Sequence, residues 1–182
     1  MLSPYLLQEA DDFSYLFTSG RGITYHVYFL DYSYMFTEYP QLAENVYSFN
    51  IDVIDGDISL TGDDERIGLT IVEVFKTFFT RQKNVAVYVC DSADERHLAR
   101  KRKFDFWFWK YNDGSIIKED GVAVVEDMEI LNSLLLHRNN PYCSEIIFAF
   151  KDLKCPELAI SKGKINCLKK YLPTNFLFPF QT

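Results

Sequence analysis

The stretch YVCDSADERHLARKRKFDFWFWKY (residues 88–111) contains the changes of pattern that decide the fold. It begins as an apolar run, continues with five Arg or Lys residues within positions 96–103, and ends in a run of aromatic residues. The apolar run is typical of a central strand that is buried on both faces of a sheet. The basic part is expected to be helical, since Ser92 and Glu95 form a capping box that places the helix start at Ala93.

The aromatic end of this stretch predicts a strand and not a continuation of the helix. Residues 104–111 are rich in β-prone aromatics, and the turn signal NDG at 112–114 precedes a second strand at 115–118. We therefore expect a helix over 93–103 and a hairpin after it. Alternation along such a strand puts bulky side chains on both faces. The second face then needs cover from the C-terminal segment or from a partner chain, which includes a second copy in a homo-oligomer.

Upstream of this stretch the sequence predicts an antiparallel meander followed by a helix. Residues 13–30 form two β-type runs around a Ser-Gly-Arg-Gly turn, and 46–54 form a third. Within 64–81, apolar residues recur every three or four positions, which indicates a helix with one buried stripe. Asp63 or Asp64 is available as its N-cap.

Downstream, the patterns predict a further helix, a further strand and an apolar C-terminal segment. Residues 127–140 have a helical pattern, 144–153 a strand pattern, and 156–182 are expected to pack on the body as a strap. With 182 residues, the chain is long enough for one domain to bury a substantial core. The prediction is a single α+β domain over 1–182, with a mixed, mainly antiparallel sheet of six or so strands and two principal helices.

Composition bounds the function. The net charge of −7 argues against a protein that coats nucleic acid or anionic membrane with its whole surface, so nucleic acid and membrane are not expected partners. The cysteines have neither CxxC pairs nor zinc spacing, which predicts no metal site; they are Cys90, Cys143, Cys155 and Cys167. No leader pattern or long apolar run occurs, so we expect a cytoplasmic protein. No cofactor is expected either.

The basic segment and the aromatic run supply the candidate binding residues. They are Asp91, Arg96, Arg100, Lys101, Arg102, Lys103, Trp107 and Trp109. One interpretation is a solvated basic face, with Leu98 and Ala99 toward the core. The other is a site for an acidic or phosphate-bearing partner, because basic side chains and helix-start amides attract anions. Asp91, at the end of the buried strand, either fixes the helix through an ion pair with Arg96 or orients a ligand.

The order of the predicted elements over roughly residues 23–111 resembles the later part of the GNAT acyltransferase superfamily. In that family a Q/R-x-x-G-x-G/A loop entering the first helix holds the pyrophosphate of coenzyme A. The phosphate-loop candidates here are Arg66, Gly68 and Thr70. Ala99 stands where the family places a tyrosine as general acid. The resemblance implies a degenerate acyl-CoA-dependent acyltransferase, whose site requires two central strands that diverge and a cleft beside Gly68.

The text of residues 88–108 is also similar to a family of small bacterial proteins of unknown function. Those proteins share a strand ending in YxCDSxD, an Arg-rich helix and an F-x-x-W-F step. The matching residues are Tyr88, Cys90, Asp91, Ser92, Asp94, Arg96, Arg100, Arg102, Phe104, Trp107 and Phe108. No activity follows from this resemblance. We therefore expect an interaction or regulatory module, with the acyltransferase as the alternative.

Overall fold

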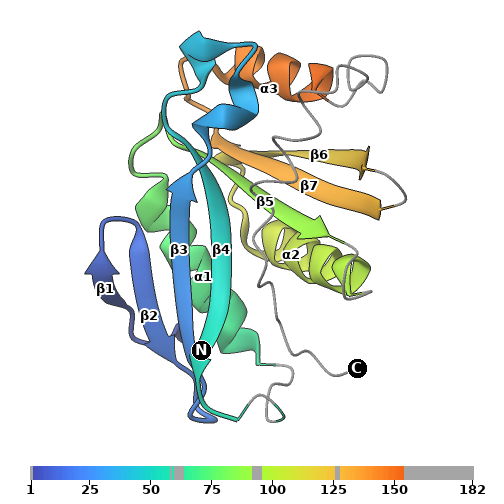
Figure 1. Ribbon diagram of the computed structural model, residues 1–182. Coiled ribbons are helices and arrows are strands. Elements are labelled where there is room, and N and C mark those ends of the chain that lie inside the picture. Colours follow the sequence, from blue (N-terminus) through green and yellow to red (C-terminus); the bar gives the residue numbers. More distant parts are fainter. Residues whose placement is uncertain (1, 58, 60–63, 92–95, 126–127, 154–182) are drawn as a thin grey trace.

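The computed structural model describes residues 2–57, 59, 64–91, 96–125 and 128–153. These residues form one mixed sheet with the strand order β1-β2-β3-β4-β5-β7-β6 (Figure 1). The strands are β1 (Gln8–Asp11), β2 (Ser14–Thr18), β3 (Thr24–Asp31), β4 (Val46–Asp55), β5 (Val85–Asp91), β6 (Ile116–Val125) and β7 (Met128–His137). The predicted α+β class and the mainly antiparallel mixed sheet are confirmed.

Helices cover both faces of the sheet. They are α1 (Glu65–Phe78), α2 (His97–Tyr111) and α3 (Cys143–Asp152), with short 3-10 helices η1 (Ser33–Phe36) and η2 (Pro40–Leu42). Alternate residues of β5 show the layering: Ala86 and Tyr88 belong to the core that contains α1 and α2 residues. Val85 and Val87 pack with residues of α3, η1 and η2. The central strand is therefore buried on both faces, as the sequence predicted.

β2, β3 and β4 form the predicted three-stranded meander, β1 adds a short strand that the sequence did not predict, and the connection to β5 changes the sheet. β1 to β4 pair antiparallel in sequence order. β4 and β5 then run parallel, but they pair only from Val46 with Val85 to Ser48 with Val87. Figure 1 shows the two strands diverging beyond that point. β5 continues on its other side with β7, which pairs with β6.

The helix α1 follows its sequence pattern closely. Asp64 is the N-cap, and its carboxylate accepts a hydrogen bond from the Arg66 backbone N–H at 3.0 Å. One stripe faces the sheet and is buried; it includes Ile67, Ile71, Val74 and Phe78. Phe78 stacks on Phe29 of β3 with 3.8 Å between ring centroids. The predicted helix and its cap are confirmed.

The predicted hairpin strand at 104–111 is wrong, because these residues complete α2. Helical spacing puts the rings of Phe104, Trp107, Phe108 and Tyr111 on one side of the helix, where they join the core with α1. Burial of these rings outweighs the β-propensity of aromatic residues, which depends on context. In the described chain α2 begins at His97, with Arg96 as N-cap and no side-chain cap. The predicted capping box at 92–95 lies outside the described residues.

Two assignments downstream are also wrong. The predicted helix at 127–140 is β7, a strand between β5 and β6. Its consecutive residues Leu134, Leu135 and Leu136 are buried on alternate faces of the sheet. The predicted strand at 144–153 is α3, because Ile146, Ala149 and Phe150 form a buried stripe at helical spacing. The strand predicted at 115–118 is confirmed, and it continues through 119–125 to form β6. The predicted C-terminal strap lies outside the described residues.

Candidate functional site

The helix α2 has an inner and an outer face, and the outer face carries apolar side chains. Leu98, Phe106 and Trp109 are 52%, 57% and 76% exposed. Arg102 is also exposed. It lies between them, because positions 98, 102, 106 and 109 share one side of a helix. The expectation that Leu98 and Ala99 face the core is wrong, because both are exposed. We call Leu98, Arg102, Phe106 and Trp109 the outer face of α2.

The structure does not bring the basic cluster together on one surface. Arg100 points inward and is only 3% exposed. The Lys103 ammonium lies 5.5 Å from the ring centroid of the buried Trp107. Arg96 and Arg102 are exposed. Of the predicted basic residues, these two therefore have the most accessible side chains.

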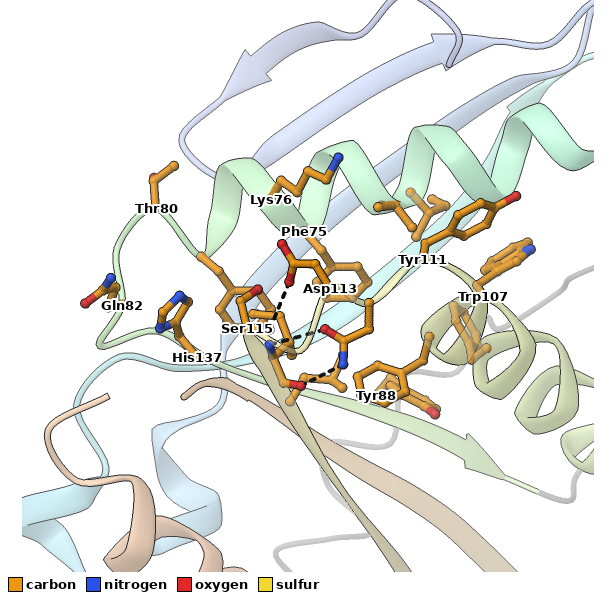
Figure 2. Close-up of a pocket in the computed structure, with 18 residues that line it drawn as sticks. Phe75, Lys76, Thr80, Gln82, Tyr88, Trp107, Tyr111, Asp113, Ser115 and His137 are labelled. Atoms are coloured by element: carbon orange, nitrogen blue, oxygen red, sulfur yellow. Dashed lines mark hydrogen bonds between the residues drawn. The ribbon is translucent and has the colours of Figure 1, made fainter. Parts of the chain in front are cut away.

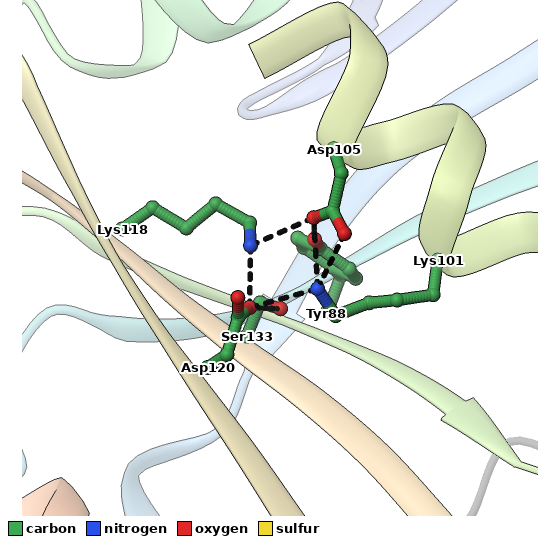
Figure 3. A network of polar contacts seen from close by, with 6 residues as sticks. All are labelled: Tyr88, Lys101, Asp105, Lys118, Asp120 and Ser133. Carbon is green, nitrogen blue, oxygen red and sulfur yellow. Dashed lines mark hydrogen bonds and ion pairs between the residues drawn. The ribbon is translucent and has the colours of Figure 1, made fainter. Parts of the chain in front are cut away.

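Lys101 belongs instead to a network that joins α2 to the sheet (Figure 3). Its Nζ lies 2.7 Å from Asp105 Oδ2 and 3.0 Å from Asp120 Oδ1. Lys118 Nζ lies 2.7 Å from Asp105 Oδ1 and also contacts the Asp120 carboxylate. Two ammonium groups and two carboxylates therefore neutralise one another. The side chain of Lys118 is only 4% exposed.

Hydrogen bonds favour the charged forms of Asp120 and Lys101 in this network. Burial opposes ionisation of Asp120, but hydrogen bonds from Lys118, Ser133 and Lys101 prevail and lower its pKa to about 2. Burial likewise opposes the charged form of Lys101, yet hydrogen bonds with Asp105 and Asp120 raise its pKa. All the stated shifts favour the charged forms. The network therefore acts as an electrostatic clamp between α2, β6 and β7.

Tyr88 of β5 lies against the clamp. Its hydroxyl is 3.4 Å from Asp105 Oδ1, and burial raises its pKa, with the nearby carboxylates of Asp105 and Asp120 adding to the rise. A phenol held neutral in this way can donate a hydrogen bond at neutral pH. Sequence reasoning missed the clamp because its members come from α2, β6 and β7, which are far apart in the sequence. The Lys101 to Asp105 spacing of four on a helix was its one local signal.

The phosphate-loop candidates are engaged by the N-terminal segment of the same chain. Thr70 Oγ1 accepts a hydrogen bond from the Tyr5 backbone N–H at 2.8 Å. Arg66 Nε donates to the carbonyl oxygen of Ser3 at 2.8 Å, and its guanidinium lies 3.9 Å from the Tyr5 ring centroid. The Asp64 carboxylate caps the helix start with negative charge. This arrangement does not favour a phosphate at the start of α1.

Trp107 fills the space beside Gly68, the third phosphate-loop candidate. A Cβ atom at Gly68 would lie 2.4 Å from Trp107 Nε1 and 2.7 Å from Cδ1. The glycine therefore allows α1 and α2 to cross closely, which is a packing role. Trp107 is buried at this crossing, whereas Trp109, the other candidate tryptophan, is on the outer face.

Asp91 is described by its backbone, and two of the four cysteines lie in the described part of the chain. Asp91 is the last residue of β5, where its backbone is opposite Ile130 of β7, and its side chain is outside the described part of the structure. Cys90 is buried in the core. Among the described residues, no group of three or more His, Cys, Asp and Glu side chains is arranged to hold a metal ion.

Comparison with known proteins places this region in a family without an assigned activity. Residues 63–152 match the model described as a family of unknown function (DUF6169). The match runs from the start of α1 through α3 and includes the pattern at 88–108, so the expected family of unknown function is confirmed over these residues. No curated protein and no solved structure matches the chain. None of the helices in the described ranges has the length and apolar character needed to span a bilayer.

Proposed function

We propose that the protein is an interaction module that binds an acidic protein segment through the outer face of α2. The observation that carries the proposal is the exposure of Trp109, with Phe106 and Leu98 beside it on the same helix face. Clustered exposed apolar side chains mark interaction surfaces, and Trp is a favoured anchor at such surfaces. The expected compartment is the cytoplasm, and regulation of the partner is the role that such a module would serve.

The charge of the outer face indicates that the partner is acidic. Asp105 is the only acidic residue between His97 and Tyr111, and its carboxylate is turned into the clamp by Lys101 and Lys118. Arg102 lies within the apolar stripe and is exposed. The outer face therefore presents positive charge and apolar area from a chain whose total charge is negative. A segment with Asp or Glu next to Leu, Phe or Trp matches both properties.

The test is selection of a random peptide library on the full-length protein. We expect the retained peptides to be enriched in acidic and large apolar residues. Their affinity should fall about ten-fold or more in Trp109→Ala, the loss typical of an interface anchor. In Arg102→Ala the salt dependence of binding should weaken, because one charge pair is removed.

A matched control is Phe148→Ala, which removes another exposed aromatic side chain from a helix, in this case α3. It should leave the affinity unchanged. Selection of peptides without acidic enrichment, or equal affinities for Trp109→Ala and wild type, would show that the outer face is not this binding site. Homo-oligomerisation through the same face is the competing proposal, and light scattering across concentrations separates the two.

A second candidate is acyl transfer from coenzyme A, supported by the divergence of β4 and β5 after three paired positions. The site of the GNAT acyltransferases requires two central strands that diverge in this way. The filling of the space beside Gly68 by Trp107 weighs against this candidate, as does the capping carboxylate of Asp64. Calorimetric titration with coenzyme A and acetyl coenzyme A tests this candidate. Saturable binding of either compound would favour an acyltransferase, and no binding of either would exclude it.

A further inference from the structure

A cavity of about 330 Å³ lies between α1, α2 and the loop that leads into β6 (Figure 2). This volume is within the usual range of small-molecule sites. Seven of its eighteen lining residues are Phe, Tyr or Trp. Phe75 comes from α1, Tyr88 from the sheet, and Phe104, Trp107, Phe108 and Tyr111 from α2. The walls therefore present aromatic faces and edges from several elements.

The loop wall of this cavity is fixed by its own hydrogen bonds. Asn112 Nδ2 donates to the Ile116 carbonyl oxygen at 2.9 Å, and Asn112 Oδ1 accepts from the Gly114 backbone N–H at 3.1 Å. Asp113 Oδ1 accepts from the Ser115 backbone N–H at 2.9 Å. A wall held in this way does not have to be ordered by a ligand, which lowers the cost of binding.

One end of the cavity carries side-chain donors. Figure 2 shows Thr80, Gln82 and His137 there, away from Trp107 and Tyr111. His137 Nδ1 accepts a hydrogen bond from the Asn139 backbone N–H at 3.0 Å. The neutral ring therefore carries its proton on Nε2, which is a donor. The Gln82 side-chain amide is a second donor, so this end suits a hydrogen-bond acceptor.

We propose that the cavity binds a small planar aromatic molecule that carries one acceptor group, such as a carboxylate, directed toward His137 and Gln82. Stacked and edge-on contacts with the surrounding rings favour an aromatic body over an aliphatic one. The limited volume excludes long chains. This site is on the inner side of α2 and is separate from the partner surface proposed above.

The test follows the two indole N–H signals of full-length ¹⁵N-labelled protein during titration with 2-naphthoate. The Trp107 signal should shift with saturation, whereas that of Trp109 should stay in place because Trp109 points to solvent. Trp109→Phe assigns the two signals. Cyclohexanecarboxylate, a non-aromatic acid, should cause a much smaller shift of the Trp107 signal.

Two variants test the geometry of the cavity. Val72→Phe adds a ring to the α1 wall and should weaken 2-naphthoate binding about ten-fold. His137→Leu removes the donor and should weaken 2-naphthoate while leaving naphthalene unchanged. The proposal is overturned by equal shifts of both indoles or by no saturable shift. Full affinity in Val72→Phe would overturn it as well.

Discussion

The two long helices on the same face of the sheet use their side chains in opposite ways. α1 buries an apolar stripe that includes Ile71 and Phe78 and leaves charged residues such as Lys76 outside. α2 buries Arg100 beside its inner aromatics and leaves Trp109 and Phe106 exposed. α1 has the pattern expected of a helix that only stabilises a core. α2 has apolar side chains that folding does not use, which points to a role beyond folding.

The largest expected difference comes from truncating a ring on each helix. Phe78→Ala should lower the free energy of unfolding by about 4 kcal/mol, because the ring is fully buried against Phe29. Phe106→Ala should change it by no more than about 0.5 kcal/mol, because that ring is mostly exposed. Chemical denaturation of both variants measures the contrast, and equal losses would show that the outer face of α2 is covered.

Breaking the clamp should be next in size. Lys118→Met should lower the free energy of unfolding by about 2–3 kcal/mol, because a buried ammonium is removed and two carboxylates are left with Lys101 alone. Lys76→Met is the matched control, since Lys76 forms an exposed pair with Glu73. The Lys76→Met variant should lose no more than about 0.5 kcal/mol in free energy of unfolding. A Lys118→Met protein as stable as the control would mean that the clamp does not hold α2 to the sheet.

The crossing of α1 and α2 gives a smaller effect. Gly68→Ala should cost about 2 kcal/mol, because the added methyl group would overlap the Trp107 ring, and this outweighs the better helix propensity of Ala. The double variant with Trp107→Leu should recover part of that loss relative to Trp107→Leu alone. Full additivity of the two changes in denaturation would contradict the close contact.

The smallest expected effect is linked to pH. The folded pKa of Asp120 is about 2, below its ordinary value of 3.8, so its stabilising contribution is present above about pH 4 and lost as pH falls toward 2. Because the side chain is half exposed, Asp120→Asn should cost about 1 kcal/mol at pH 7. Denaturation between pH 7 and pH 2 should show the difference from wild type shrinking in that window. A difference independent of pH would exclude an ionised Asp120 as its source.

The elements that could be predicted from the sequence are those whose local pattern and burial agree. Apolar residues alternate along the strands of the meander and recur every three or four positions in α1. The order of these strands, and the helix with its N-cap, could therefore be predicted. In 104–111 the β-propensity of the aromatics conflicted with their helical spacing, and packing against α1 decided the outcome. The predictions for β7 and α3 failed for a related reason, because short apolar runs fit the period of a strand as well as that of a helix.

The candidate sites depended on contacts that no local pattern contains. The clamp around Lys118 requires α2, β6 and β7 to meet, and the cavity requires α1, α2 and the loop at 112–115. Of the residues that the sequence singled out, Arg102 and Trp109 both lie on the outer face. Sequence reasoning could not separate exposed from buried members without the helix, because in a strand the two faces divide differently.

Acrylamide quenching of the two tryptophans tests the central claim most directly, which is that α2 continues through the aromatic run with one buried and one exposed face. Helical geometry places Trp107 and Trp109 about 200° apart around the axis, whereas a strand would point both to the same side. Trp107→Phe and Trp109→Phe proteins each report on one ring. We predict that Trp109 is quenched several times more efficiently than Trp107, in line with their exposure. Equal quenching of the two rings, or stronger quenching of Trp107, would contradict the account.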